Sequence, residues 1–242
     1  MKSPHGFSLI EMAFVLVIVT LLLGGLLVPF TTQIEQKRIA ETQKAMEEIK
    51  EALLGYAVAN GSLPCPASVT NNGQALSSCN GVGYLPYATL GINRADAWGR
   101  LYRYAVNPNF TTTFALTSSG TGTCSSPSTP SISVYTRDDS TGAASALACN
   151  VVAVIISPGK NGYGGYDTDG NQMAPPGSNT DEYVNAVSSG GGTNPLFYSR
   201  TQTGPRASCK DGSTTPCEFD DLVTWLSPNV LFNRMVAAGK LP

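Results

Sequence analysis

Residues 6–34 read GFSLIEMAFVLVIVTLLLGGLLVPFTTQI, and this stretch decides how the 242-residue chain is organised. The run from Met12 to Ile34 contains 23 residues without a formal charge. Because a helix rises ~1.5 Å per residue, a run of this length spans about 30 Å, the thickness of a bilayer core. Secretory signals have a shorter apolar region of roughly 7–15 residues followed by a small-x-small cleavage site, which is missing here before Glu35. The run therefore predicts a segment that stays in the protein as a single membrane anchor.

The leader before this stretch is short and basic, and one carboxylate lies at the edge of the apolar run. Residues 1–6 contain Lys2 and no acidic residue, which predicts a cytoplasmic N-terminus. Glu11 directly precedes the uncharged run. A carboxylate in lipid is costly and is usually paired or functional. The alternative is a plain signal anchor whose glutamate extends to the lipid headgroups.

The hexapeptide from Gly6 to Glu11, GFSLIE, resembles the cleavage and methylation motif of class III signal peptides in the type IV pilin and type II secretion pseudopilin superfamily. The resemblance implies that prepilin peptidase cleaves after Gly6 and that Phe7 becomes an N-methylated first residue. Glu11 is then the fifth mature residue, where the family has its glutamate. The resemblance also implies an inner-membrane, single-pass protein with a periplasmic head. An inner-membrane assembly platform would add it to other pilin or pseudopilin subunits in a filament.

Cleavage would create a new α-amino group at Phe7, which stays positive after N-methylation. In a helical stack, the Glu11 carboxylate of one subunit can meet the Phe7 ammonium of its neighbour. Pairing lowers the cost of a carboxylate in lipid, so Glu11 is expected to set the register between subunits.

After the apolar run, an amphipathic pattern extends the same helix. Apolar residues repeat every seven positions, with others interleaved on the same face: Ile39, Thr42, Met46, Ile49, Leu53 and Tyr56. Asn60-Gly61 followed by Pro64 ends the helix, which should run from about Ser8 to Ala59. The expected organisation is therefore a leader (1–6), a transmembrane and filament-core helix (7–34), an amphipathic helix (35–60) and a β-rich head (61–242). A coiled-coil dimer is the alternative for residues 35–60, although fewer than three heptads are present.

The head should place an antiparallel β-sheet against the amphipathic helix, which gives an α+β, pilin-like fold. Strands are expected at 101–106, 131–136 and 151–156, with a weaker candidate at 114–117. Two short helical turns are expected within 219–238, and polar loops at 66–84, 118–130 and 157–216. The stretch from Asp96 to Tyr104 is similar to the D-x-W-G-x-x-Y-x-Y segment of major pseudopilins; the same residues also suit a Trp-anchored turn before a strand.

All six cysteines lie beyond the anchor, where an exported head would oxidise them. Six cysteines allow 15 pairings. Short loops favour three of the possible pairs: Cys65–Cys79, Cys124–Cys149 and Cys209–Cys217. The alternative is a metal site, but the sequence has no CxxC pair.

A Gly-rich segment after the most apolar strand offers oxygen ligands of the kind that Ca²⁺ prefers. Asp167, Asp169 and Asn171 alternate around a glycine, and Asp181 follows. Major pseudopilins bind calcium in a Gly/Asp loop after a strand ending in S-x-G, so the resemblance implies a Ca²⁺ site here. No other cofactor is required. The alternative is a polar loop closed by Asx turns.

The composition excludes most catalytic readings. The only histidine is His5, in the leader, so cleavage would leave no histidine for Ser-His-Asp triads, Cys-His dyads or HExxH zinc sites. Net charge is −2, which argues against nucleic-acid binding by bulk electrostatics. The expected function is therefore a non-enzymatic structural subunit of a bacterial type IV pilus or type II secretion pseudopilus. Two alternatives are a signal-anchored periplasmic enzyme or binding protein and a minor pilin that binds DNA or a surface. The nearest approach to a DNA-binding patch consists of Arg94, Arg100, Arg103, Tyr102 and Tyr104, which also suit the surface of a sheet.

Overall fold

In a computed structural model of the protein, the chain is described except at residues 1–5, 7, 80, 116–130, 139–140, 176, 178–179, 188–194, 207, 214 and 242. Side chains of residues 23–30 also lie outside the described set. The chain divides into two compact units, Met1–Glu41 and Thr42–Pro242. The second unit contains the head, and the predicted α+β class is confirmed.

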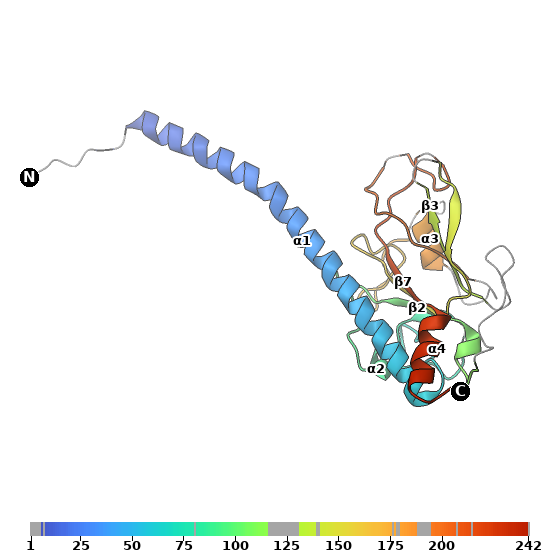
Figure 1. Cartoon of the computed structure of the whole chain (residues 1–242). Helices are drawn as coiled ribbons and strands as arrows, with labels where there is room; N and C mark the ends of the chain where they lie inside the picture. Colours follow the sequence, from blue (N-terminus) through green and yellow to red (C-terminus); the bar gives the residue numbers. More distant parts are fainter. Residues whose placement is uncertain are drawn as a thin grey trace, which may run out of the picture. The chain divides into compact units, whose positions relative to one another are not determined.

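Helix α1 (Leu9–Asn60) is the long helix that the sequence predicts (Figure 1). It ends where the chain turns left-handed at Gly61, whose φ is 71° and whose amide donates to the carbonyl of Ala57 at 2.8 Å. The Asn60 side chain also caps this end, because its Nδ2 donates to the Tyr56 carbonyl at 2.9 Å. Glycine suits this position because it adopts positive φ without steric cost.

Within the second unit, the predicted apolar face of α1 is buried. Thr42, Met46, Ile49 and Leu53 each expose 2% or less of their surface. The hydroxyl of Thr42 accepts a hydrogen bond from the amide of Ala97 at 3.2 Å, which fixes the helix to the head. This face packs against the chain's own head, as the amphipathic pattern predicts, and not against a coiled-coil partner.

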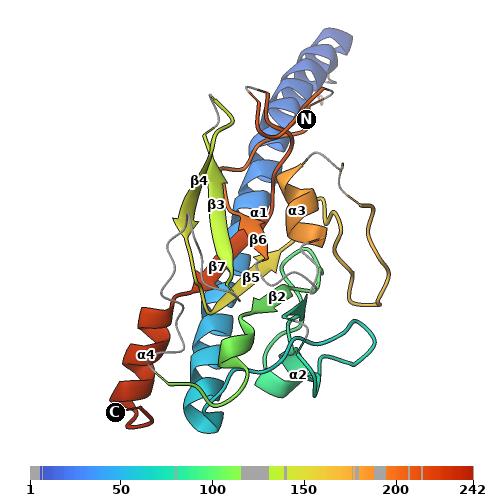
Figure 2. The ribbon, with the colours of Figure 1, turned by 90° about the vertical axis from the view of Figure 1, so that its right-hand side faces the viewer.

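The head contains two sheets (Figure 2). The first has the order β1-β2-β5-β7 and is antiparallel throughout; its strands are β1 (Val82–Tyr84), β2 (Arg103–Val106), β5 (Ala153–Ser157) and β7 (Leu222–Leu226). The second has the order β4-β3-β6; its strands are β3 (Ser133–Arg137), β4 (Ala144–Ala148) and β6 (Leu196–Tyr198). Strand β6 pairs in parallel with β3, which differs from the all-antiparallel expectation.

The two faces of β5 explain why its sequence is a continuous apolar run. Val154 and Ile156 pack into a core cluster with Val134 and Phe197 of the second sheet. Ile155 points to the opposite face, because side chains alternate along a strand. There it pairs with Tyr104, whose hydroxyl donates to the Pro64 carbonyl at 3.3 Å. All five residues of β5 are therefore buried.

The sequence expectations for the C-terminal part were partly wrong. Residues 219–238 contain strand β7 followed by helix α4 (Pro228–Ala237), in place of two helical turns. The β-branched and aromatic run Leu222–Leu226 completes the edge of the first sheet. Ser227 then caps α4, with its hydroxyl accepting from the Val230 amide at 3.4 Å.

Three elements lie inside segments that the sequence assigned to loops: β1, β6 and helix α3 (Asp181–Val187). Strand β4 and two short helical elements, α2 (Tyr87–Leu90) and η1 (Pro108–Phe110), were also not predicted. At the weak strand candidate, Phe114 and Ala115 belong to no strand, and residues 116–117 lie outside the described residues.

Two of the three favoured disulfides are confirmed, Cys65–Cys79 and Cys209–Cys217. The third, Cys124–Cys149, includes Cys124, which lies outside the described residues. The confirmed pairs close sequence separations of 14 and 8 residues, so each constrains a local loop of the head.

Leu53→Ala should lower the free energy of unfolding by about 2–5 kcal/mol, because it empties a fully buried site between α1 and the head. The matched control is Val236→Ala on α4, where 45% of the side chain is exposed and the change should stay within about 0.5 kcal/mol. Thermal or denaturant unfolding of both variants gives the comparison. Equal stability of the two variants would contradict the packing of α1 described above.

Candidate assembly motif and candidate cation site

The first turn of α1 is closed by a reciprocal pair of hydrogen bonds between Ser8 and Glu11. The Ser8 amide donates to the Glu11 carboxylate at 3.0 Å, and the Glu11 amide donates to the Ser8 hydroxyl at 3.3 Å. This is a capping box, in which a serine and a glutamate three residues apart satisfy each other's backbone donors. The carboxylate of Glu11 therefore lies next to the amide that follows Phe7, the expected N-terminus after cleavage. Phe7 itself lies outside the described residues.

Residues 9–22 of α1 expose large apolar side chains along their whole length. Leu9 is 93% exposed and Leu21 72% exposed, for example, in the unit Met1–Glu41. Among the described residues, the structure contains no helix whose length and hydropathy suffice for a membrane crossing. The predicted span 12–34 includes residues 23–30, whose side chains are outside the described set.

The predicted calcium ligands Asp167, Asp169 and Asn171 form one exposed turn that is satisfied internally. Asp167 Oδ1 accepts from the amides of Asp169 and Asn171 at 2.9 and 2.8 Å, and its Oδ2 accepts from Asn171 Nδ2 at 3.0 Å. The hydrogen bond from the Asn171 side chain and the backbone donors lower the pKa of Asp167. These contacts match the Asx-turn alternative.

Asp181 does not face this turn as a free ligand; it is the centre of a buried ion-pair network. Its two oxygens accept from Arg137 Nε at 2.8 Å and from Arg200 Nε at 3.0 Å. Arg200 also bonds Asp211 at 3.1 Å and lies over the Phe219 ring at 4.6 Å. Both oxygens of Asp181 accept from guanidinium groups, and its role as a calcium ligand stays a prediction.

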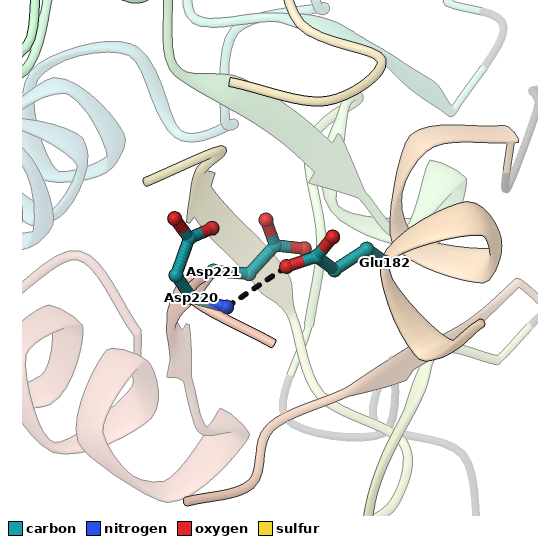
Figure 3. Close-up of side chains that lie close together, drawn as sticks. All are labelled: Glu182, Asp220 and Asp221. Atoms are coloured by element: carbon teal, nitrogen blue, oxygen red, sulfur yellow. Dashed lines mark hydrogen bonds between the residues drawn. The ribbon is translucent and has the colours of Figure 1, made fainter. Parts of the chain in front are cut away.

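A different carboxylate cluster lies between α3 and the start of β7 (Figure 3). It consists of Glu182, Asp220 and Asp221, which offer oxygen atoms that all lie within 4.8 Å of one another. Glu182 projects from α3 towards the other two residues, and its Oε1 accepts from the Asp220 amide at 2.8 Å. Glu182 is 2% exposed and Asp221 6% exposed, so the charges gather away from solvent.

Asparagine side chains and backbone amides point their donors at this cluster. Asn161 Nδ2 lies 3.2 Å from each oxygen of Glu182, and the Asn161 amide donates to Asp220 Oδ2 at 2.8 Å. Asn185 Nδ2 donates to Asp221 Oδ2 at 2.8 Å. Donors of this kind favour charged carboxylates, which accept hydrogen bonds at both oxygens. One oxygen stays unsatisfied among the described residues: Asp220 Oδ1 is buried without a hydrogen-bond partner.

The three carboxyl groups of the cluster hold their protons more tightly than free carboxyl groups do. Burial, with the neighbouring charge of Asp221, raises the pKa of Glu182 to about 9. Burial likewise raises the pKa of Asp221 to about 8 and that of Asp220 to about 6. Arg103 and Arg200 oppose the shift at Asp221, but Arg200 already pairs with two other carboxylates. The arrangement can therefore hold either protons or a cation.

The Ser157-Pro158-Gly159 loop approaches the cluster closely and is itself fixed by Asp96. The Ser157 hydroxyl donates to Asp96 Oδ2 at 2.5 Å, while Asp96 Oδ1 accepts from the amides of Trp98 and Arg100, both at 2.9 Å. Gly159 has a φ of 63°, and a Cβ there would lie 2.6 Å from Asp220 Oδ1. The D-x-W-G segment thus anchors the loop whose glycine admits the Asp220 carboxylate.

The sequence analysis did not predict this cluster, because it took the alternating oxygens of Asp167, Asp169 and Asn171 as the cation ligands. Adjacent acidic residues were the available sign of it. Asp220 and Asp221 are adjacent acidic residues directly before a strand, and Glu182 directly follows Asp181. The side chains meet only because α3 packs beside the start of β7, about 40 residues later in the chain.

Stability should fall as pH rises from about 5 to 9 in a chelator, since three carboxyl groups have raised pKa values and the folded state then binds more protons than the unfolded state. Glu182→Gln removes one of these charges at nearly the same shape, so it should flatten the decline. Melting temperature against pH for both proteins is the measurement, with Asp167→Asn as the exposed control. If the melting temperature of Glu182→Gln falls with pH as steeply as that of the wild type, Glu182 does not cause the decline.

Comparison with protein families gives a match at the N-terminus. Residues 1–27 match the family described as prokaryotic N-terminal methylation motif. No curated protein and no solved structure matches the chain. The resemblance at residues 6–11 is thereby confirmed: the chain carries the signal motif of type IV pilins and pseudopilins.

Proposed function

We propose that the protein is a structural subunit of a bacterial type IV pilus or type II secretion pseudopilus and has no catalytic role. The observation that carries this proposal is the methylation motif at residues 1–27, continued by a 52-residue helix. Prepilin peptidase would cleave after Gly6, and the inner-membrane assembly platform would insert the mature subunit among others. The membrane anchor belongs to the same proposal.

The geometry at the start of α1 supports a pairing role for Glu11. Its carboxylate accepts from the Ser8 amide, one residue from the ammonium that cleavage would create at Phe7. In the proposed filament, the positive N-terminus of a neighbouring subunit approaches this carboxylate. The Ser8 amide already makes a charge-assisted hydrogen bond to this carboxylate, and an ammonium partner would add a second.

Two arginines of the DNA-binding alternative are unsuited to that role. Arg103 is half-buried and donates to the Ala186 carbonyl, and Arg100 has a buried Nε. Binding to phosphates needs exposed cations, so this geometry favours a structural role over nucleic-acid binding. A signal-anchored periplasmic enzyme or binding protein stays the alternative, and processing at Gly6 distinguishes it.

Glu11→Gln should be cleaved and methylated normally but should yield few or no filaments, because glutamine keeps the capping box and loses the charge. Ser8→Ala is the matched control, since it weakens the cap by about 0.5–2 kcal/mol and leaves the Glu11 charge. Intact mass gives processing, and the sheared or secreted filament fraction gives assembly.

Filament yield at the wild-type level in Glu11→Gln would contradict charge pairing. Ser8→Ala is expected to keep its filaments, and a loss as large as that in Glu11→Gln would contradict the assignment of the defect to charge. A mature N-terminus other than methylated Phe7 would contradict the proposed function itself.

We further propose that the head is stabilised by Ca²⁺ at Glu182, Asp220 and Asp221, in place of the turn at Asp167. The donor set fits, because Ca²⁺ takes carboxylate and carbonyl oxygens and three carboxylates already lie within 4.8 Å of one another. Asp220 Oδ1 is buried without a hydrogen-bond partner among the described residues, and a bound cation would give this oxygen a partner. Bound Ca²⁺ would neutralise charge that the nearby arginines leave uncompensated.

Calcium at a hundred times its dissociation constant should stabilise the protein by about 2.7 kcal/mol and raise the melting temperature by roughly 5–10 °C. The rise should be larger at pH 8 than at pH 5, because protons compete for the same oxygens. Asp220→Asn should remove the effect and Asp167→Asn should keep it. The opposite result for these two variants would return the site to the exposed turn.

A further inference from the structure

The carboxylate cluster has two arms that come from segments far apart in the chain. Glu182 projects from α3, and Asp220 and Asp221 directly precede β7 (Figure 3). Like charges in buried surroundings repel each other strongly, because such surroundings screen charge poorly. When the carboxyl groups are ionised and no cation is bound, other contacts must therefore hold α3 against the segment before β7.

The first arm is held by Asp211, a residue of the loop that the Cys209–Cys217 disulfide closes. Asp211 Oδ2 accepts from the amide of Asp181, the first residue of α3, at 2.6 Å. The other oxygen of Asp211 accepts from the Cys217 amide at 2.8 Å. Because Asp181 directly precedes Glu182, Asp211 fixes the turn of α3 that carries the glutamate of the cluster.

The second arm begins at the same disulfide. Cys217 lies three residues before Asp220. The Cys217 carbonyl accepts from Arg200 Nη2 at 2.9 Å and from the Thr203 hydroxyl at 2.6 Å. Thr203 and Phe219 also exchange two backbone hydrogen bonds, of 2.9 and 3.0 Å. The disulfide-closed loop thus fixes both arms of the cluster.

The two ends of this disulfide differ in their access to solvent. Cys217 is 2% exposed, whereas Cys209 is an exposed residue. The other cysteines that the structure describes are partly buried: Cys65, Cys79 and Cys149. A disulfide is reduced when a thiolate attacks one of its sulfur atoms, so access decides which sulfur is attacked. A reductant in solution would therefore approach this disulfide at Cys209, with the Cys217 sulfur as the leaving group.

We propose that the Cys209–Cys217 disulfide controls cation binding at the carboxylate cluster. The oxidised loop holds the two arms together, and reduction lets them separate and weakens binding. A site whose ligands are already held in place binds more tightly, because less ordering accompanies binding. The inference rests on the proposed Ca²⁺ site and adds its regulation.

The redox step needs a dithiol as its reductant. The dithiol supplies two electrons and two protons, the S–S bond breaks to give the two thiols of Cys209 and Cys217, and the dithiol leaves as its own disulfide. Asp211 then loses the covalent closure of its loop. Hydrogen bonds and ion pairs alone oppose the repulsion between Glu182 and the two aspartates.

The first test compares Ca²⁺ affinity at pH 8 in the full chain, purified in detergent. Combining Cys209→Ser with Cys217→Ser should raise the dissociation constant about tenfold above that of the oxidised wild type, because the ligands lose their preorganisation. The matched control combines Cys65→Ser with Cys79→Ser and should keep the wild-type dissociation constant. Among the described residues, no hydrogen bond joins the Cys65–Cys79 loop to the cluster.

The second test uses the wild-type chain, so it does not depend on the folding of a variant. By linkage, if reduction weakens Ca²⁺ binding about tenfold, saturating Ca²⁺ lowers the midpoint potential of the disulfide by about 30 mV. The protein is equilibrated with a dithiol redox buffer in Ca²⁺ or in a chelator, and free thiols are alkylated. Peptide masses then give the reduced fraction of each pair. Cys209–Cys217 should shift, and Cys65–Cys79 should not.

The outcomes separate the redox control from the cation site. The coupling would be overturned by an unchanged dissociation constant in a folded Cys209→Ser, Cys217→Ser variant. A Ca²⁺-induced shift at Cys209–Cys217 no larger than that at Cys65–Cys79 would also overturn it, and either result leaves the cation site standing. An oxidised wild type whose melting temperature does not respond to Ca²⁺ would contradict the cation site itself, and the coupling with it.

Discussion

The head depends on how two adjacent carboxylates of α3 are neutralised. Asp181 and Glu182 are both at most 2% exposed, yet they face opposite surroundings. Asp181 meets two guanidinium groups, which join β3, the end of β6 and the Cys209–Cys217 loop around it. Glu182 meets two further carboxylates. Burial of like charges is costly unless a proton or cation joins them, so the packing of α3 against β7 depends on what the cluster binds.

This division explains what the sequence could predict. The long helix, its buried stripe and the strands β2, β3 and β5 follow from local periodicity, and the short disulfide loops follow from spacing. The methylation motif is also local. Strands β1 and β6 have only three residues each, and their existence depends on neighbours distant in the sequence. Residues 222–226 form a strand because they pair with β5. An apolar run of this length is equally compatible with a helix, so the sequence did not distinguish the two.

The predicted calcium ligands of the exposed turn illustrate the same limit of local patterns. Alternating oxygens at Asp167, Asp169 and Asn171 form a recognisable pattern, but an Asx turn produces the same pattern by satisfying itself. Cation sites in folded proteins often gather ligands from separate segments, and α3 and the residues before β7 supply those of the proposed site. The resemblance to pseudopilins placed a site after the S-x-G strand end, and Gly159 does lie against Asp220. The sequence alone did not predict that this loop packs beside Asp220.

The low charge of the chain connects these features to assembly. Only 13% of residues are charged. In the head, many of these belong to the ion-pair network of Asp181 or to the carboxylate cluster of Glu182. The proposed filament contact therefore rests on the long helix, whose apolar run begins within the methylation motif.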